Sequence, residues 1–565
     1  MKPELTDQKL RGGYYTPKPI ADFLAKWAIT TSDQDLLEPS CGDGVFLESA
    51  IIRYEELGLS KKDIAKKIHA VEFVKEEAEK ASENIERLNV PIKSNQIQIG
   101  DFFSYCNDHL LNEDFLDDQK KIINKSHRKQ RKFDVILGNP PFIRYQNFPS
   151  GPRELALKIM RKIGLHPNLL TNIWVPFIVT STILLNEHGR LGMVIPAELF
   201  QVKYAAETRK FLCDNFNKIT LISFKKLLFE DVQQEVILFL GEKNGDEKSG
   251  IRMIEIDSSQ DLANYTPDDI NHLEIKPNYH TDEKWIKYYL NRDELTFLES
   301  LKGNPKLTIS GEVIDVDVGV VTGENNFFIF TKDRAKENKV VTNLEKIVTR
   351  SAHLKGIRFS DDDYNKNVDL GLPTSLLKLS KVTKSQLSLS LQKYIENGET
   401  LEVNKGFKCR VRNPWYVVPS VWIPDAFMLR QVHSYPKIIL NETGATCTDT
   451  IHRVKFKNGQ NGKIISAAFL NSLTFAFAEI TGRSYGGGVL TFEPSEAEGI
   501  PIPLIKANKL NFSKIDKLLR SGNIEKILDI NDKILLMDGL GLSAVEITKI
   551  RNIWMKLRDR RINRK

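Results

Sequence analysis

The sequence predicts an α/β fold: a doubly wound, mostly parallel sheet of seven strands, followed by a domain of mixed α+β structure. Two observations support this. Short apolar runs alternate with helical patterns in the first part of the chain, as in parallel sheets. From about residue 300 to residue 505, short strand-like runs are mixed with Gly, Asn and Pro turns. The expected strands are 36–38, 68–73, 97–100, 133–138, 191–196, 219–222 and 236–240.

The first predicted helix follows the segment Gly13-Tyr14-Tyr15-Thr16-Pro17. Threonine is a good helix cap and proline suits the first helical position, so Thr16 and Pro17 predict a helix start. Apolar residues then recur at helical spacing at Ile20, Phe23, Leu24 and Trp27.

A glycine-containing turn lies between the first strand and a helix expected to run through Ile52. Its sequence is Glu38-Pro39-Ser40-Cys41-Gly42-Asp43-Gly44. Glycines let the backbone approach a ligand closely, and the helix start offers free N–H groups. The turn lacks the three glycines of a dinucleotide fingerprint and the Gly-Lys-Ser/Thr of a phosphate loop. It therefore predicts a nucleotide-type cofactor other than NAD or ATP.

Acidic residues end the next two strands. Glu72 closes the strand 68–73, where an open α/β sheet places a carboxylate for ribose hydroxyls. Asp101 and Phe102 follow the strand 97–100, which brings an acceptor and an aromatic ring together for an adenine. An acid in such a position is more often a helix cap, so the order of the whole set carries the argument.

The strand 133–138 leads into Asn139-Pro140-Pro141-Phe142, which specifies a chemistry. An exocyclic amine conjugated to a ring becomes nucleophilic when acceptors hold its hydrogens. The Asn139 side-chain oxygen and the Pro140 carbonyl, on a backbone stiffened by two prolines, supply two acceptors. The Phe142 ring can stack on a planar base. For the tetrapeptide alone, a strand ending in a Pro-Pro turn is the competing interpretation.

Taken in order, these motifs resemble the Rossmann-like class I methyltransferases that use S-adenosyl-L-methionine, and among them the gamma-class N6-adenine DNA methyltransferases of restriction-modification systems. The resemblance implies that the glycine turn holds the amino-acid part of the cofactor, Glu72 its ribose, and Asp101 with Phe102 its adenine. The cofactor-binding residues that it implies are Tyr15, Thr16, Glu38, Pro39, Ser40, Gly42, Gly44, Glu72, Asp101, Phe102, Asn139 and Pro141. The family usually has Tyr where this chain has Phe142.

The resemblance also implies a mechanism. A target adenine leaves the duplex, its N6 is held by Asn139 and Pro140, and N6 attacks the cofactor methyl group in line. Phe142 and, by resemblance, Phe229 would stack on the extruded base; a core aromatic is an equally good interpretation of Phe229. The cofactor turn precedes Asn139 and one large region follows it, which fits the gamma order rather than the alpha or beta order.

The polar stretch 241–250 suggests a domain boundary. We expect a catalytic domain at 1–245, a target-recognition domain at 250–505 and a helical segment at 506–565. Three blocks in the second part, 316–328, 409–419 and 482–490, resemble recurring signatures of the target-recognition domains in this class. They combine Arg, Asn, Tyr and Ser with glycine turns, which suits phosphates and base edges.

Charge is mildly positive, with a net +7. Two runs are strongly basic, and each could contact phosphates or be a solvated loop and a frayed tail. They are Lys120, Lys121, Lys125, Arg128, Lys129, Arg131 and Lys132, and then Lys556, Arg558, Arg560, Arg561, Arg564 and Lys565. We expect double-stranded DNA as partner, a monomer, and any cognate restriction endonuclease as a separate protein.

Composition, with 41% hydrophobic and 27% charged residues, is that of a globular protein. The five scattered cysteines and ten histidines predict neither a disulfide framework nor a metal site. No apolar run predicts a membrane span or secretory signal, so we expect a cytoplasmic protein. Two alternatives stay open: a methyltransferase acting on RNA or a protein glutamine, and a catalytically inactive DNA-binding specificity subunit.

Overall fold

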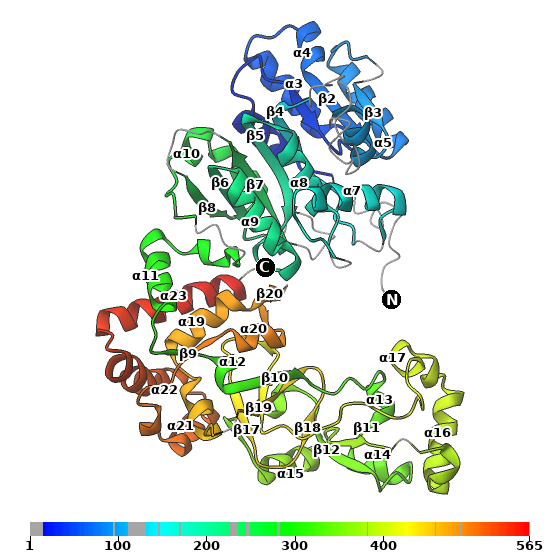
Figure 1. The fold of residues 1–565 in the computed structure, drawn as a ribbon, viewed down its shortest axis with the longest axis vertical. Helices are drawn as coiled ribbons and strands as arrows, with labels where there is room; N and C mark the ends of the chain where they lie inside the picture. The colour runs from blue at the N-terminus through cyan, green and yellow to red at the C-terminus, as the bar shows by residue number, and fades with distance from the viewer. Residues whose placement is uncertain are drawn as a thin grey trace, which may run out of the picture. The chain divides into compact units, whose positions relative to one another are not determined.

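The computed structural model describes residues 15–93, 96–110, 131–144, 147–168, 171–226, 228, 235–243, 249–278, 283–380, 382–457, 459–485 and 487–563. The chain divides into two compact units. The N-terminal unit extends to Leu295, and the C-terminal unit comprises Thr296–Asn563 (Figure 1).

The N-terminal unit is built on one sheet of eight strands in the order β3-β2-β1-β4-β5-β7-β6-β8. The strand β7 is antiparallel to both of its neighbours, and the other pairs are parallel. The strands are β1 (Leu36–Glu38), β2 (Ile68–Glu72), β3 (Ile97–Ile99), β4 (Phe133–Gly138), β5 (Leu185–Pro196), β6 (Lys218–Phe224), β7 (Val236–Glu242) and β8 (Gly250–Ile256). The predicted doubly wound fold is confirmed, with an eighth strand added to the predicted seven.

The added strand bears on the expected domain boundary. β8 begins at Gly250 and pairs along its length with β6, so the chain returns to the first sheet after the polar stretch 241–250. The division between the compact units falls later, at Leu295. A polar, glycine-containing stretch marks a turn between strands as readily as a boundary between domains.

Helices cover both faces of this sheet. One face packs α2, α3 and α5 in a single apolar core with alternate strand residues such as Val135, Leu137 and Val194. On the other face α8 contacts β5. The helices of this unit are α2 (Lys18–Ala28), α3 (Val45–Glu56), α4 (Lys61–Lys67), α5 (Lys75–Arg87), α6 (Phe102–Tyr105), α7 (Ser150–Lys162), α8 (Trp174–Leu184), α9 (Ala206–Asn215) and α10 (Pro267–Asn271); α11 (Arg292–Lys302) spans the division.

Two local expectations need correction. The cap of α2 is Pro17 rather than Thr16, and the Thr16 hydroxyl accepts a hydrogen bond from Asn139 instead. The strand expected at 191–196 begins earlier, because β5 runs from Leu185 to Pro196 and includes Gly189. There Gly189 lies so close to the neighbouring strand that an added Cβ would be 3.0 Å from the Asp134 carbonyl oxygen.

The C-terminal unit contains four small sheets, ordered β10-β19-β15-β17-β13, β11-β14-β12-β18, β16-β21-β20 and β22-β9. This confirms the mixed α+β character predicted for the region. Its strands are β9 (Leu307–Ile309), β10 (Ile314–Val318), β11 (Ile329–Phe330), β12 (Leu344–Val348), β13 (Arg358–Phe359), β14 (Ser375–Leu377), β15 (Ala426–Leu429), β16 (Gln431–Val432), β17 (Ile438–Asn441), β18 (Thr446–Cys447), β19 (Ile451–Phe456), β20 (Arg483–Tyr485), β21 (Val489–Thr491) and β22 (Pro501–Pro503).

In Figure 1, α16 and α17 lie at one end of the C-terminal unit, and α21, α22 and α23 lie at the other. The helices of this unit are α12 (Ser310–Val313), α13 (Asn325–Phe328), α14 (Lys332–Glu337), α15 (Asp361–Asp369), α16 (Leu389–Thr400), α17 (Phe407–Arg410), α18 (Gly462–Ala468), α19 (Ser472–Thr481), α20 (Pro494–Glu498), α21 (Phe512–Arg520), α22 (Ile524–Asn531) and α23 (Ala544–Ile562).

Within the described residues, no single helix is long and apolar enough to cross a membrane, although the bent pair α18 and α19 passes that test by length and composition.

Candidate active site

The predicted site residues share one edge of the N-terminal sheet. The strand β1 lies between β2 and β4, and β3 lies beyond β2, all four parallel. Their carboxyl ends therefore point the same way and carry, in spatial order, Asp101, Glu72, the turn after Glu38, and Asn139. This is the edge at which doubly wound sheets bind ligands.

The glycine turn is joined directly to the second strand. The backbone N–H of Gly42 donates to Oε2 of Glu72 at 2.8 Å, and the N–H of Val74 donates to Oε1 at 2.9 Å. Gly42 has a φ of 53°, in the left-handed region that favours glycine. The Glu72 carboxylate is thus fixed at both oxygens by backbone donors.

Glu38 is the most deeply buried acid of the edge. Its side chain is 1% exposed, and Oε2 has no hydrogen-bond partner among the described residues. Burial, with the nearby carboxylates Glu72 and Asp43, raises its pKa well above the ordinary value. Burial also raises the pKa of Glu72 and of Asp101. The edge therefore offers buried acceptors that a ligand with hydroxyl or ammonium donors would satisfy.

Asn139 is hydrogen-bonded to two of the other predicted cofactor segments, the one at Thr16 and the glycine turn. The Ser40 hydroxyl donates to the Asn139 carbonyl oxygen at 3.3 Å, and the Asn139 side-chain Nδ2 donates to the Thr16 hydroxyl at 3.1 Å. Because Nδ2 points to Thr16, the amide oxygen Oδ1 lies on the opposite side of the amide group. Thr16 thus sets which amide atom is presented as acceptor.

The turn after β1 and the end of β4 are in close contact. A Cβ added to Gly138 would lie 3.3 Å from Cδ of Pro39, tighter than ordinary van der Waals contact. Gly138 therefore allows the Pro39 ring to sit against the strand that presents Asn139. Pro140 is buried, and Pro141 and Phe142 are half-buried, with Phe142 packed against the core that contains α2 and α3.

The Asp101-Phe102 pair differs from its expected arrangement in one respect. Asp101 caps α6, with Oδ2 accepting from the Ser104 N–H at 2.7 Å. The Phe102 ring is 2% exposed and stacks on Phe177 with centroids 5.1 Å apart. Its ring faces are thus in the core rather than open at the sheet edge.

An open aromatic ring does lie beside the predicted ribose acid. Phe73 directly follows Glu72 and is 55% exposed. From the sequence, Phe73 was expected only as the end of the strand 68–73. An apolar ring directly after an acid at a strand end, where a loop begins, was the signal that could have singled it out.

Of the two remaining predicted residues, the structure describes Tyr15 but not Phe229. Tyr15 is 45% exposed, and its hydroxyl donates to Oε2 of Glu77 at 2.9 Å, at the start of α5. Phe229 lies outside the described residues, as do the basic positions Lys120, Lys121, Lys125, Arg128 and Lys129.

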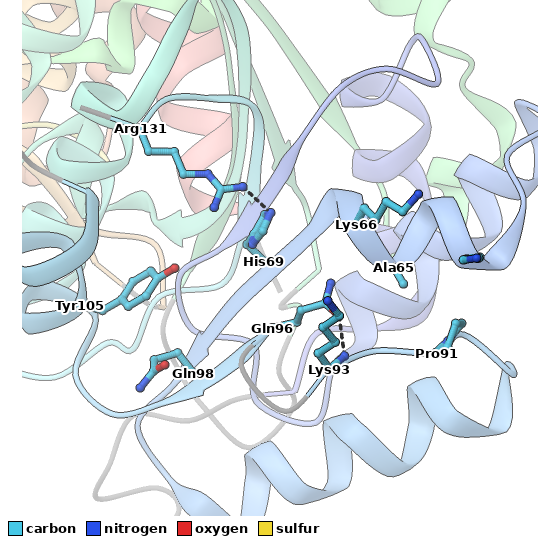
Figure 2. A pocket seen from close by; sticks show the side chains of 10 residues that line it. Ala65, Lys66, His69, Pro91, Lys93, Gln96, Gln98, Tyr105 and Arg131 are labelled. Atoms are coloured by element: carbon cyan, nitrogen blue, oxygen red, sulfur yellow. Dashed lines mark hydrogen bonds between the residues drawn. The ribbon is translucent and has the colours of Figure 1, made fainter. Parts of the chain in front are cut away.

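A cavity of about 820 Å³ lies near the amino ends of β2, β3 and β4, at the other end of these strands from Asn139 (Figure 2). Its lining includes Lys62, Lys66, Lys93 and Arg131. Arg131 Nη2 is 2.6 Å from Nε2 of His69 and 4.0 Å from Asp35, and Lys66 pairs with Asp63 at 2.8 Å. Part of its positive charge is therefore compensated within the protein.

In the described part of the basic tail, Arg558 and Arg561 make contacts within the fold. Arg561 is 2% exposed, and its guanidinium makes two bonds to the Glu479 carboxylate, at 2.9 and 2.7 Å, and one to the His433 carbonyl. Arg558 pairs with Asp559 and covers the Trp554 ring. Arg564 and Lys565 lie outside the described residues. In the part of the chain that the structure describes, no group of three His, Cys, Asp or Glu side chains could hold a metal ion.

The strand order and the loops at this edge define the methyltransferase-like α/β fold. Two family models match the chain: "Eco57I restriction-modification methylase" over residues 54–229, and "Type II methyltransferase M.Eco57I, C-terminal domain" over residues 282–536. The chain is a type II restriction-modification DNA methyltransferase of the Eco57I family.

Relatives agree with this assignment along the chain. The type II methyltransferase M.AccI of Acinetobacter calcoaceticus is 24% identical over 94% of each chain. M.HindII of Haemophilus influenzae is 25% identical over 62% of this chain and 60% of its own. Among solved structures, the Type IIL restriction-modification enzyme MmeI in complex with DNA shares the fold, with a TM-score of 0.57 at 12% identity over 96% of this chain and 75% of MmeI.

Proposed function

We propose that this enzyme transfers a methyl group from S-adenosyl-L-methionine to N6 of an adenine that is extruded from duplex DNA, with Asn139 and Pro140 holding the amine. The observation that supports this most strongly is the placement of Asn139 directly after β4, where its side chain donates to the Thr16 hydroxyl and its backbone carbonyl accepts from the Ser40 hydroxyl, both in predicted cofactor segments.

The cofactor fits the chemistry of this edge. An ammonium group and two ribose hydroxyls are donors, and the buried carboxylates of Glu38 and Glu72 are acceptors. We assign Glu38 and the following turn to the amino-acid part and Glu72 to the ribose. When bound, the cofactor supplies an electrophilic methyl group on a sulfonium.

For the adenine of the cofactor we assign Asp101 as polar partner and Phe73 as the exposed aromatic wall. Phe102 then supports the site from the core, because its buried ring is already stacked on Phe177. We also assign Tyr15, whose hydroxyl donates to Glu77, to the cofactor site.

The chain's own residues act on the target amine by position and hydrogen bonding. The Asn139 Oδ1 and the Pro140 carbonyl accept the two N6 hydrogens, which draws the nitrogen lone pair out of conjugation and toward the methyl group. Phe142 supplies a ring face for the extruded base, and Phe229 is proposed as its counterpart.

Purified enzyme, duplex DNA and cofactor carrying a deuterated methyl group would test this. After digestion to nucleosides, mass spectrometry should find the label in N6-methyladenine. Label in N4-methylcytosine would contradict the adenine assignment, because cytosine carries the same kind of exocyclic amine. The Glu72→Gln variant should bind the cofactor more weakly in calorimetry, whereas Glu76→Gln, an exposed acid on α5, should not.

A further inference from the structure

The short helix α17 presents an unusual combination of side chains. Phe407 is 67% exposed and Val411 is 66% exposed, so a large ring and an aliphatic side chain face solvent together. Lys408 Nζ lies 5.8 Å and Arg410 Cζ lies 5.9 Å from the centroid of the Phe407 ring. An exposed apolar group framed by cations is typical of an interaction surface rather than of a folded core.

This surface is held rigidly from below. Cys409, between the two cations, is 1% exposed and belongs to an apolar core cluster with Phe327 and Tyr394. The Arg412 guanidinium donates to the carbonyls of Thr322 and Val321, both at 2.7 Å. α17 is therefore fixed to the loop at residues 321–326, so the structure unites two of the sequence blocks singled out in the C-terminal region.

The charge of the surface is largely uncompensated. Lys408 and Arg410 have no carboxylate partner among the described residues, whereas Lys405 pairs with Glu402 at 2.7 Å. Glu324, the acid on the adjoining loop, is used to cap α13. Two exposed cations beside exposed Asn325 and Asn326 favour a polyanionic partner with polar edges.

We propose that α17 and the loop at 321–326 form a DNA-contact surface of the C-terminal unit, with Lys408 and Arg410 on phosphates and Phe407 against a sugar or base. This proposal rests on the proposed function, since it takes duplex DNA as the substrate. Sequence-independent contacts to phosphates would position the duplex, and the ring would add apolar contact.

The test is binding of a fluorescein-labelled duplex of mixed sequence to the full chain, followed by anisotropy between about 50 and 200 mM salt. The variant Lys408→Gln/Arg410→Gln should weaken binding and lower the slope of log affinity against log salt by about 0.9 for each lost phosphate contact. The matched control is Lys514→Gln/Lys517→Gln, which removes two exposed cations from α21 at the other end of this unit in Figure 1. It should leave the slope unchanged.

Phe407→Ala should weaken binding about fivefold or more without changing the slope, because it removes apolar contact but no charge. Val545→Ala, at a side chain 78% exposed on α23, is its control. Unchanged affinity and slope in all α17 variants with unchanged melting temperatures would overturn the proposal and point to a protein partner for this surface. Binding is read without catalysis, so a failure of the adenine assignment would not alter these results.

Discussion

The orientation of the Asn139 side-chain amide is set by its hydrogen bond to Thr16. Thr16 accepts the hydrogen bond from Nδ2, and its own side chain is buried at 7% exposure. The oxygen and the NH2 group of a carboxamide are similar in size and shape. An acceptor that binds the NH2 group therefore fixes the side on which the oxygen lies. In the proposed reaction, Thr16 is therefore a positioning residue.

Replacing Thr16 by Val should lower the single-turnover rate of methyl transfer about fivefold to tenfold, with little change in DNA affinity. One hydrogen bond to a catalytic group is worth about 1 kcal/mol, which corresponds to this loss. Thr16→Ser keeps the hydroxyl and should retain most of the rate. Equal losses in the Val and Ser variants would mean that Thr16 acts through packing instead.

The protonation of Glu38 makes the stability of the fold depend on pH. Its pKa in the folded chain is raised by burial, so the folded state favours the protonated form. Stability from this group is therefore present below its unfolded pKa of about 4.5 and is lost as the pH rises through the folded value.

The Glu38→Gln variant removes this penalty and should be more stable than the parent without cofactor. The gain in melting temperature should be small near pH 5 and increase toward pH 8, while cofactor affinity falls. Calorimetry over this range measures both. A constant difference between the two proteins at all pH values would show that Glu38 stays ionised in the fold.

At the scale of elements, the site depends on how closely the turn after β1 approaches β4. Gly138 and Pro39 define this contact, and the bond from Ser40 to the Asn139 carbonyl spans it. A side chain at Gly138 would displace the turn that we assign to the cofactor.

Gly138→Ala should therefore raise the KM for S-adenosyl-L-methionine several-fold, since Pro39 must move by a few tenths of an ångström, and Gly138→Val should raise it further. Gly151→Ala is the control, because an added Cβ there meets nothing within 4 Å. A KM for Gly138→Ala equal to that of the control would contradict the proposed role of this contact.

The sequence was informative about this edge because each strand is a short apolar run that ends in a polar signal. The strands ending at Glu38, Glu72 and Gly138 were all expected, and the sheet brings their ends together. Details set by tertiary packing were not predictable. The Phe102 ring is buried against Phe177, which is distant in sequence. The Thr16 hydroxyl accepts a hydrogen bond from Asn139 and does not cap the helix as expected.

At the scale of the molecule, the strands of the N-terminal unit could be predicted from the sequence in more detail than those of the C-terminal unit. The N-terminal unit has one sheet whose strands are mostly short apolar runs, whereas the four small sheets of the C-terminal unit contain long-range pairings such as β10 with β19. Such pairings have no local sequence signal. The eighth strand was missed for the same reason, because β8 pairs with β6 across an intervening strand and loop.

The C-terminal basic tail illustrates a charge run that stabilises the fold. The buried Arg561 joins α23 to Glu479 of α19 and to backbone carbonyls of two other segments. Arg561→Gln leaves Glu479 buried without its partner and should lower the free energy of unfolding of the C-terminal unit by about 3–5 kcal/mol.

The measurement is the denaturant transition of the full chain, with Lys556→Gln, an exposed position on the same helix, as control. The control should stay within about 0.5 kcal/mol of the parent. A normal transition in Arg561→Gln combined with a reduced salt slope of DNA binding would assign this arginine to DNA instead.

The central claim, that Asn139 carries methylation of adenine N6 in DNA, is tested most directly by single-molecule kinetic sequencing of genomic DNA from a methylation-deficient bacterial host that expresses the protein. We predict N6-methyladenine in one defined sequence motif, and none in DNA from cells expressing Asn139→Ala at an equal level. Unmodified DNA from cells with the parent enzyme, or the same modified motif with the variant, would contradict the account.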